Sequence, residues 1–415
     1  MTLQSPIPDL RGIPPIEHAK HRVGLADVLT DEGFRLFFPL AALHAALWPF
    51  LWIAVQGYNL LGATQITSSV WHMHEMLYGS FGAALIGFLT TAFPEWTDTR
   101  PMRGRVLWYF AGAWGVARVI GLLGADLLTP LAALADLAWL GGLIAYAVWI
   151  SWTKRTDRLL AFIGWLAAFA LAEAVTRGWM ISGASFEAAQ AVKVAGLIFL
   201  GMLGLALARI GVPVTNLVLD PTEQTSPFRP HPGRLNLASG LVAVAIAGQV
   251  AGLSEAVNGW LLVAAGAGLL DRVGEGFVGR DGRRAEIVAL WLPPALAGAG
   301  LLWLGAGQLG APLAPAGGWH LALMGGLGLA VLAVMSIAGL FHSGHTLPVA
   351  RPVKWAIGVM LASVMVRLAP ELGVIDPFLA HLAASILWAA AFGLWLVAYW
   401  PLLSDPATLG KHEGC

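Results

Sequence analysis

Twelve long apolar runs account for most of the 415-residue chain and limit what it can fold into. A helix needs about 20 mainly apolar residues to cross the hydrocarbon core of a bilayer, and the runs have about that length. Charged residues make up 12% of the chain, whereas soluble domains carry about 25%. The sequence therefore predicts an all-α polytopic membrane protein with about twelve transmembrane helices, at residues 34–56, 70–94, 105–124, 130–152, 158–181, 189–211, 235–253, 256–278, 285–306, 318–341, 353–372 and 379–403.

The lysines and arginines alternate between the two sides of the predicted bundle. Of the 24 lysines and arginines, all but four lie in the terminal segments or in every second loop, including the helix ends that border it. The alternate loops, such as 57–69 and 307–317, contain none. By the positive-inside rule, both termini and the basic loops are cytoplasmic. We expect a multi-pass membrane protein in contact with the lipid bilayer. The formal net charge of zero gives no indication of a nucleic acid partner.

The chain divides into one membrane domain and two polar ends. Residues 34–403 form the predicted twelve-helix domain, whose longest cytoplasmic loop, 212–234, connects the sixth and seventh helices. Residues 1–33 form a polar cytoplasmic segment, and residues 404–415 form a cytoplasmic tail. The single cysteine, Cys415, lies in that tail, so a metal in the membrane domain must be bound by histidine, methionine or carboxylate groups.

Several charged residues lie inside the predicted spans, in the half of the membrane away from the cytoplasm. The basic ones are Arg118, Arg177, Lys193 and Arg367, and the acidic ones are Glu75, Asp136 and Glu173. Ionisable groups inside spans are costly, and they are usually functional or mutually paired. The three arginines could pair with the three carboxylates and only hold helices together. The gathering of the whole set on one side favours a shared polar cavity that faces outward.

The stretch "SSVWHMHEMLYGS", residues 68–80, opens the second predicted span with several possible metal ligands. His72 and His74 are two positions apart, so on an α-helix they point about 200° apart and cannot both face one metal. His72, Glu75 and Met76 share a face at i, i+3 and i+4. Histidine and methionine are natural ligands of haem iron and copper. His74 then faces a different neighbour, either a second cofactor or a partner that orients it.

The later histidines lie on opposite sides of the membrane. His320 is at the outer start of the tenth span, and His342 and His345 are at its inner end. His320 and His345 are separated by about 37 Å on a continuous helix with a rise of 1.5 Å per residue, so they cannot belong to one site. His342 and His345 share a helical face, although Gly344 and Pro348 indicate that the helix ends there.

Four parts of the chain together resemble the NnrS family. They are "FRLFF" at 34–38, "WHMHEMLYGSFGAALIGFLTTAFPEWT" at 71–97, "HLALMGGLGLAVLAVMS" at 320–336 with "GHT" at 344–346, and "LWAAAFGLWLVAYWPLL" at 387–403. The resemblance implies a twelve-span protein of the cytoplasmic membrane that binds haem and copper and takes part in the bacterial response to nitric oxide.

The family motifs fall on named residues of this chain. His72, His74 and Glu75 match the motif of the second span, and His320 and His345 match the late motif. The chain departs from the late motif in two places. Leu340 stands where the family usually has arginine, and Leu347-Pro348 replaces its usual Gly-Arg.

These observations lead to a first interpretation, a membrane protein with haem b and copper that handles nitric oxide. The axial ligands of the haem would be His320 with His72 or His74. The propionates would be bound by Arg118, Arg177 or Arg367 through bidentate pairing. A second metal could be bound by Met76 and by whichever of His72 and His74 does not bind the haem. The remaining candidate metal ligands are Glu75, His342 and His345.

The alternative interpretation is a small-anion transporter without a cofactor. Its pathway would be lined by the four basic residues inside the spans. The sequence contains no phosphate-binding glycine loop and no Ser/His/Asp arrangement, and it leaves open whether the protein is an enzyme, a sensor or a transporter.

Overall fold

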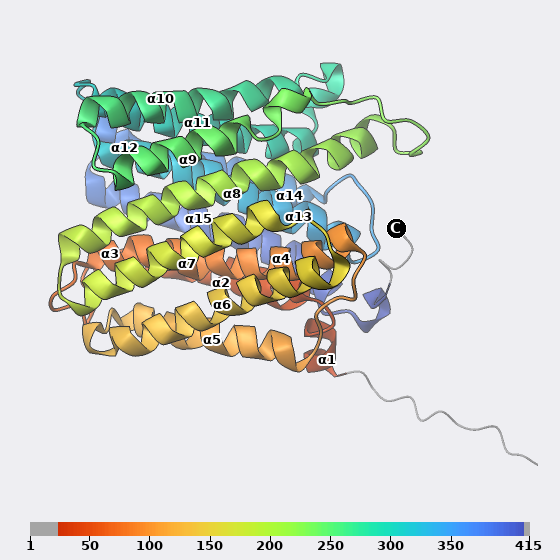
Figure 1. Ribbon diagram of the computed structural model, residues 1–415, viewed down its shortest axis with the longest axis horizontal. Helices are drawn as coiled ribbons and strands as arrows, with labels where there is room; N and C mark the ends of the chain where they lie inside the picture. Colours follow the sequence, from red (N-terminus) through yellow and green to blue (C-terminus); the bar gives the residue numbers. More distant parts are fainter. Residues whose placement is uncertain (1–23, 411–415) are drawn as a thin grey trace, which may run out of the picture.

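Long helices lie side by side in the computed structural model, which describes residues 24–410 (Figure 1). Over these residues the fold is entirely helical, with no β-strand, and the prediction of an all-α polytopic membrane protein is confirmed. Eleven helical segments of the described part are long and apolar enough to cross a membrane: Gly33–Val55, Ser68–Thr97, Arg105–Leu123, Asp126–Lys154, Leu160–Ile181, Ser185–Leu219, Pro232–Val250, Ala285–Gln308, Pro315–Phe341, Arg351–Leu372 and Pro377–Leu403.

The eighth predicted span is shorter than the others. Helix α10, Glu255–Asp271, has 17 residues, and the chain continues as the 3₁₀ helix η5, Arg272–Gly276. The predicted end at residue 278 was therefore too late, because the charged residues after Leu270 leave the apolar run. With α10, which packs against the helices before and after it, the described chain makes twelve antiparallel passes.

Glycines allow α10 to pack closely against α11, Ala285–Gln308. A Cβ atom added at Gly266 would lie 2.7 Å from the carbonyl oxygen of Gly298, and one added at Gly305 would lie 2.7 Å from that of Gly259. Small residues let helix backbones approach each other in membranes, where van der Waals packing holds helices together.

Three spans contain π-helical turns, which are rare and occur frequently at functional sites. In the first span, α2 (Gly33–Phe50) continues as η1 (Leu51–Val55). In the second, η2 (Glu75–Phe81) separates α3 (Ser68–His74) from α4 (Gly82–Thr97). In the tenth, η7 (His320–Gly328) separates α12 (Pro315–Trp319) from α13 (Leu329–Phe341).

The remaining elements are regular helices and short 3₁₀ turns. The helices are α1 (Leu25–Leu29), α5 (Arg105–Leu123), α6 (Thr129–Lys154), α7 (Leu160–Ile181), α8 (Ser185–Leu219), α9 (Leu237–Val250), α14 (Arg351–Leu368) and α15 (Pro377–Leu403). Helix α8 extends eight residues past the end predicted at residue 211, because Pro213 is accommodated inside it. The loop after it is correspondingly shorter than predicted.

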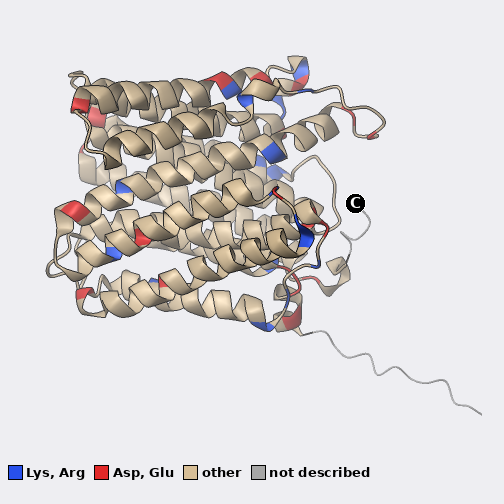
Figure 2. Ribbon diagram, viewed as in Figure 1, with Lys and Arg blue, Asp and Glu red and all other residues tan. Residues whose placement is uncertain are grey.

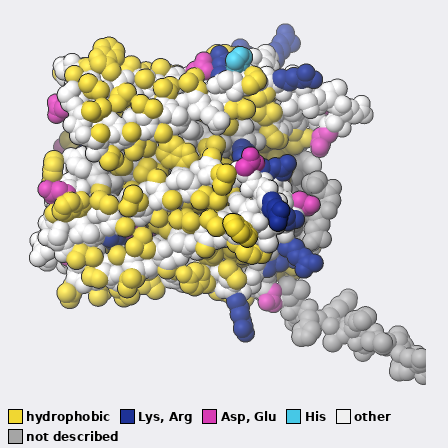
Figure 3. All heavy atoms as spheres, in the orientation of Figure 1, with side chains coloured by type: hydrophobic (Ala, Val, Ile, Leu, Met, Phe, Trp, Pro, Cys, Tyr) yellow, Lys and Arg dark blue, Asp and Glu magenta, His cyan; other side chains and the backbone are white. Residues whose placement is uncertain are grey.

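The charges at the two ends of the bundle differ. Lysines and arginines gather at the end where α1 lies, which we call the basic end (Figure 2). Hydrophobic side chains cover much of the face of the bundle that Figure 3 shows, between its two ends. This distribution agrees with the alternation in the sequence, and the cytoplasmic assignment of the basic end remains a prediction. Residues 1–23 and 411–415, including Cys415, lie outside the described residues.

Arg35 of the "FRLFF" stretch links the first span to the segment after the last span. Its side chain is fully buried and donates hydrogen bonds to the Thr408 hydroxyl and carbonyl oxygens, both at 2.9 Å, and to the Leu403 carbonyl at 3.2 Å. The start of the first span is thereby tied to the segment that follows the last one.

Candidate functional site

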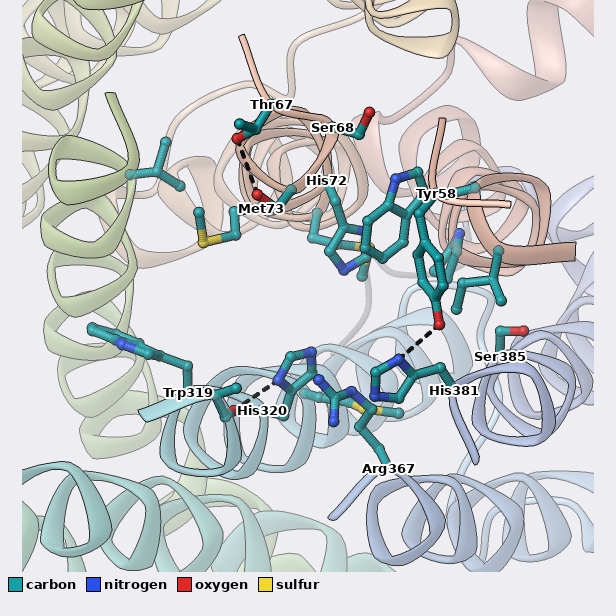
Figure 4. Close-up of a pocket in the computed structure, with 18 of the residues that line it drawn as sticks. Tyr58, Thr67, Ser68, His72, Met73, Trp319, His320, Arg367, His381 and Ser385 are labelled. Atoms are coloured by element: carbon teal, nitrogen blue, oxygen red, sulfur yellow. Dashed lines mark hydrogen bonds between the residues drawn. The ribbon is translucent and has the colours of Figure 1, made fainter. Parts of the chain in front are cut away.

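A cavity of about 1150 Å³ lies between the second, tenth and last spans, at the end of the bundle opposite the basic end. Figure 4 shows α3 on one side of it and η7, α14 and α15 on the other. All three π-helical segments of the described chain contribute to its wall. Trp52 comes from η1, Met76 and Phe81 come from η2, and His320 and Met324 come from η7. Ligand pockets are lined mainly by apolar groups with a few convergent polar ones, and this cavity has that character.

The histidines and basic side chains of the cavity wall come from five different helices. The wall includes three histidines, an arginine and a lysine, which are His72, His320, His381, Arg367 and Lys193. The sequence-based candidates His72, Met76, His320 and Arg367 are thus brought together in one place (Figure 4).

The orientation of His320 suits metal binding. Its Nδ1 lies 2.8 Å from the carbonyl oxygen of Ala316, one turn earlier. A carbonyl only accepts hydrogen bonds, so Nδ1 carries the proton and Nε2 keeps its lone pair. Metal-binding histidines almost always donate their other ring N–H to such an acceptor.

His72 is held by stacking on an aromatic ring. Its ring centroid lies 3.9 Å from that of Trp52, with an angle of 8° between the planes. The Nδ1 atom is buried and has no hydrogen-bond partner among the described residues. A buried polar atom without a partner is costly, so this nitrogen is available to a bound group.

His381 is a cavity residue to which the sequence analysis gave no role. Its Nδ1 lies 2.9 Å from the hydroxyl of Tyr58, in the connection between η1 and α3. Burial raises the pKa of the Tyr58 hydroxyl, so it remains protonated at neutral pH. The available signal was position, since His381 begins the last span at the same end as His320. Arg367, beside it, pairs with Glu371 at 3.3 Å.

Glu75 lies on the other side of the second span, so the prediction that it shares a face with His72 and Met76 is wrong. Its side chain is fully buried, and its Oε1 lies 3.3 Å from Nδ1 of His74. The physical reason is that residues three apart on an α-helix lie about 60° apart, so Glu75 stands at the edge of the His72 face. Its carboxylate contacts His74 and Arg118 instead. Met76 remains on the cavity side, apart from His74, so these two do not form the predicted second metal site.

His74 belongs to a buried ion-pair network outside the cavity. Its members, none more than partly exposed, are His44, His74, Glu75, Arg118, Asp136, Glu173 and Arg177. Arg118 Nη2 donates to both Asp136 oxygens at 2.8 Å. Arg177 donates to Asp136 at 2.5 Å and to Glu173 at 2.8 Å. The pairing considered for Arg118 and Arg177 in the sequence is therefore formed.

The charges of this network balance when His74 carries two protons. Its Nδ1 faces Glu75 and its Nε2 lies 2.9 Å from Glu173. Ionised carboxylates only accept hydrogen bonds, so the arrangement calls for a donor at both ring nitrogens. Three carboxylates then face two guanidinium groups and one imidazolium. A doubly protonated imidazole has no lone pair for a metal.

The same network contains a possible metal site. His74, Asp136 and Glu173 each offer a ligand atom, and these atoms lie within 4.8 Å of one another. The two arginines already neutralise these carboxylates, so a cation would have to replace the His74 proton and compete with both guanidinium groups. The geometry fits the ion-pair network better.

The other candidates lie away from the cavity. His342 and His345 follow α13 at the basic end, where His342 contacts Glu32 at 3.9 Å and Glu95 at 3.7 Å. The Nδ1 of His345 lies 2.9 Å from the Ser343 carbonyl.

The transporter interpretation required four cations along one pathway. Only Arg367 and Lys193 line the cavity, whereas Arg118 and Arg177 are held in the network. The arginine-lined pathway is therefore not formed in the described structure.

The comparisons with known proteins give one clear result. None of the curated proteins compared with the chain matches it. The model of the NnrS protein family matches residues 28–407, which is nearly the whole chain. Since the match covers all twelve passes and both walls of the cavity, the chain belongs to the NnrS protein family.

Proposed function

We propose that the cavity binds haem b, which His72 and His320 would hold, and that the protein takes part in the response to nitric oxide. The observation that carries the proposal is the orientation of His320, whose Nε2 is left free in a cavity bordered by every π-helical turn of the described chain. Membership in the NnrS family supports a membrane protein of the nitric oxide response.

The residues of the cavity fit a haem in size and charge. Its volume of about 1150 Å³ exceeds the range of about 300–1,000 Å³ that is usual for drug-sized ligands. Arg367 and Lys193 are the cations of its wall and would bind the propionates. The Nδ1 atom of His72 is buried without a hydrogen-bond partner. A bound group that contacts this ring would offset the cost of that burial.

Copper would bind in the same cavity rather than at His74. Three methionines, Met73, Met76 and Met324, line it together with His381. Thioether and imidazole groups form a donor set that suits Cu(I).

The protein groups would hold and orient the cofactor and control what reaches it. Ala316 fixes the ring of His320, and Trp52 fixes the ring of His72. Bound haem would supply the iron, and a diatomic ligand would have to take the place of one of its two histidines. The neutral Tyr58 hydroxyl orients His381 at its edge.

A reduced-minus-oxidised absorption spectrum of the purified protein tests this proposal. We expect a Soret band in the parent and its loss in His72→Ala and His320→Ala. His345→Ala, at the basic end, is the matched control and should keep the band. A colourless, folded parent would contradict the haem proposal, and so would a band that survives both cavity substitutions.

A further inference from the structure

A second, smaller pocket lies directly beyond the inner wall of the cavity. Its volume is about 60 Å³, and every residue that lines it is alanine, valine, leucine, methionine or phenylalanine. Phe81 belongs to the walls of both spaces. Along η7, Met324 faces the cavity and Leu327, about one turn later, faces the small pocket. We call this space the inner pocket.

Size and polarity restrict what the inner pocket can hold. One water-sized sphere needs about 10–15 Å³ by this measure, so the pocket has room for a molecule of only a few atoms. A water molecule needs two to four polar partners, and the lining side chains offer none, so apolar cavities of this kind stay dry. Ions are excluded more strongly by the same lack of partners. The fitting occupant is a small uncharged molecule that dissolves in hydrocarbon.

The inner pocket is positioned to receive such a molecule from the membrane. Its residues belong to the membrane-spanning segments, and four of them, Phe88, Ala206, Val331 and Val334, are partly exposed. The opposite wall is Phe81, which is 2% exposed. Its ring contacts that of Phe199 edge-on, with centroids 6.3 Å apart.

We propose that the inner pocket is a binding site for a small uncharged gas molecule, and that Phe81 separates it from the cavity as a gate. The molecule enters between α4, α8 and α13 and reaches the cavity when the Phe81 ring moves. A charged or strongly hydrated ligand can use only the polar end of the cavity. The binding site stands on the pocket alone, whereas its connection to a reactive centre rests on the function proposed above.

Xenon tests the pocket without any cofactor. We expect an anomalous peak beside Phe81 and Leu327 in crystals of the full chain pressurised with xenon. Ala206→Leu fills the pocket and should abolish this peak. Ala338→Leu makes the same change on α13 away from both spaces and should preserve it. A parent without the peak, or a peak that persists in Ala206→Leu, would overturn the proposal.

Rebinding of carbon monoxide after flash photolysis of the reduced protein tests the gate. Phe81→Trp and Ala206→Leu should each slow the bimolecular phase several-fold, whereas Ala338→Leu should leave it unchanged. Equal rates in all four proteins would overturn the route through Phe81. If the protein is colourless, the haem proposal falls, and the xenon peaks of parent and variant still decide whether the pocket binds gas.

Discussion

His72 and His74 are two residues apart and have entirely different surroundings. His72 stacks on Trp52 at the cavity, and a nitrogen of its ring is left without a partner. Both nitrogens of His74 contact carboxylates in the buried network. The opposed directions of the two rings follow from helical spacing, but Glu173, the second partner of His74, belongs to a later span and cannot be read from the local sequence. The partner of His44 cannot be read from its local sequence either, since it is Glu75 of the second span, at 3.4 Å.

Asp136 is the residue on which the buried network depends most. It accepts from Arg118, Arg177 and the indole of Trp139, and it is fully buried. In Asp136→Asn, the buried guanidinium groups of Arg118 and Arg177 lose the carboxylate charge that both contact. Breaking a buried ion pair typically costs about 3–5 kcal/mol, so we expect a strongly lowered midpoint of thermal unfolding in detergent.

The control for this substitution is Asp271→Asn. Asp271 pairs with Arg234 at 2.8 Å, but both side chains are more than one third exposed. Exposed pairs contribute about 0–1 kcal/mol, so this variant should unfold close to the parent temperature. Similar effects of the two substitutions would show that the network does not stabilise the fold.

At the scale of elements, hydropathy was sufficient to locate the helices, but not their irregular turns. The apolar runs predicted twelve passes, and the structure contains them. The π-helices η1, η2 and η7 leave no comparable pattern in the sequence, because they depend on how neighbouring spans pack. The error at Glu75 has a different cause, since its carboxylate contacts His74 and Arg118, and Arg118 belongs to a later span. Met76, which stays on the cavity side, was placed correctly with His72.

The close packing of α10 against α11 gives a prediction at this scale. In Gly266→Ala the new methyl group would meet the Gly298 carbonyl at 2.7 Å, so the two backbones must separate. Overpacking of this kind costs about 1–3 kcal/mol. We expect a lower unfolding midpoint, measured by thermal denaturation in detergent.

Gly240→Ala is the matched control on the neighbouring helix α9. A Cβ atom there meets nothing within 4 Å, and alanine is favoured over glycine in helices by about 1 kcal/mol. This variant should be as stable as the parent or slightly more so. A Gly266→Ala protein with the same midpoint as Gly240→Ala would argue against tight contact between α10 and α11.

For the whole molecule, the charge asymmetry predicts that the basic end is cytoplasmic and that the cavity opens at the outer face. Cysteine labelling in intact cells tests this orientation, with Cys415→Ser as the background. Leu127 is 90% exposed at the cavity end, and Glu223 is exposed at the basic end. A membrane-impermeant maleimide should label Leu127→Cys directly and Glu223→Cys only after the cells are permeabilised. The reverse pattern would place the cavity on the cytoplasmic side.

The central claim is that the cavity, and not the buried network or the basic end, is the metal centre. The most direct test is anomalous diffraction at the iron and copper absorption edges from crystals of the purified protein. Our account predicts iron between His72 and His320, with copper near the cavity methionines. Iron or copper bound at His74 with Asp136 and Glu173, or beside His342 and His345, together with an empty cavity, would contradict it.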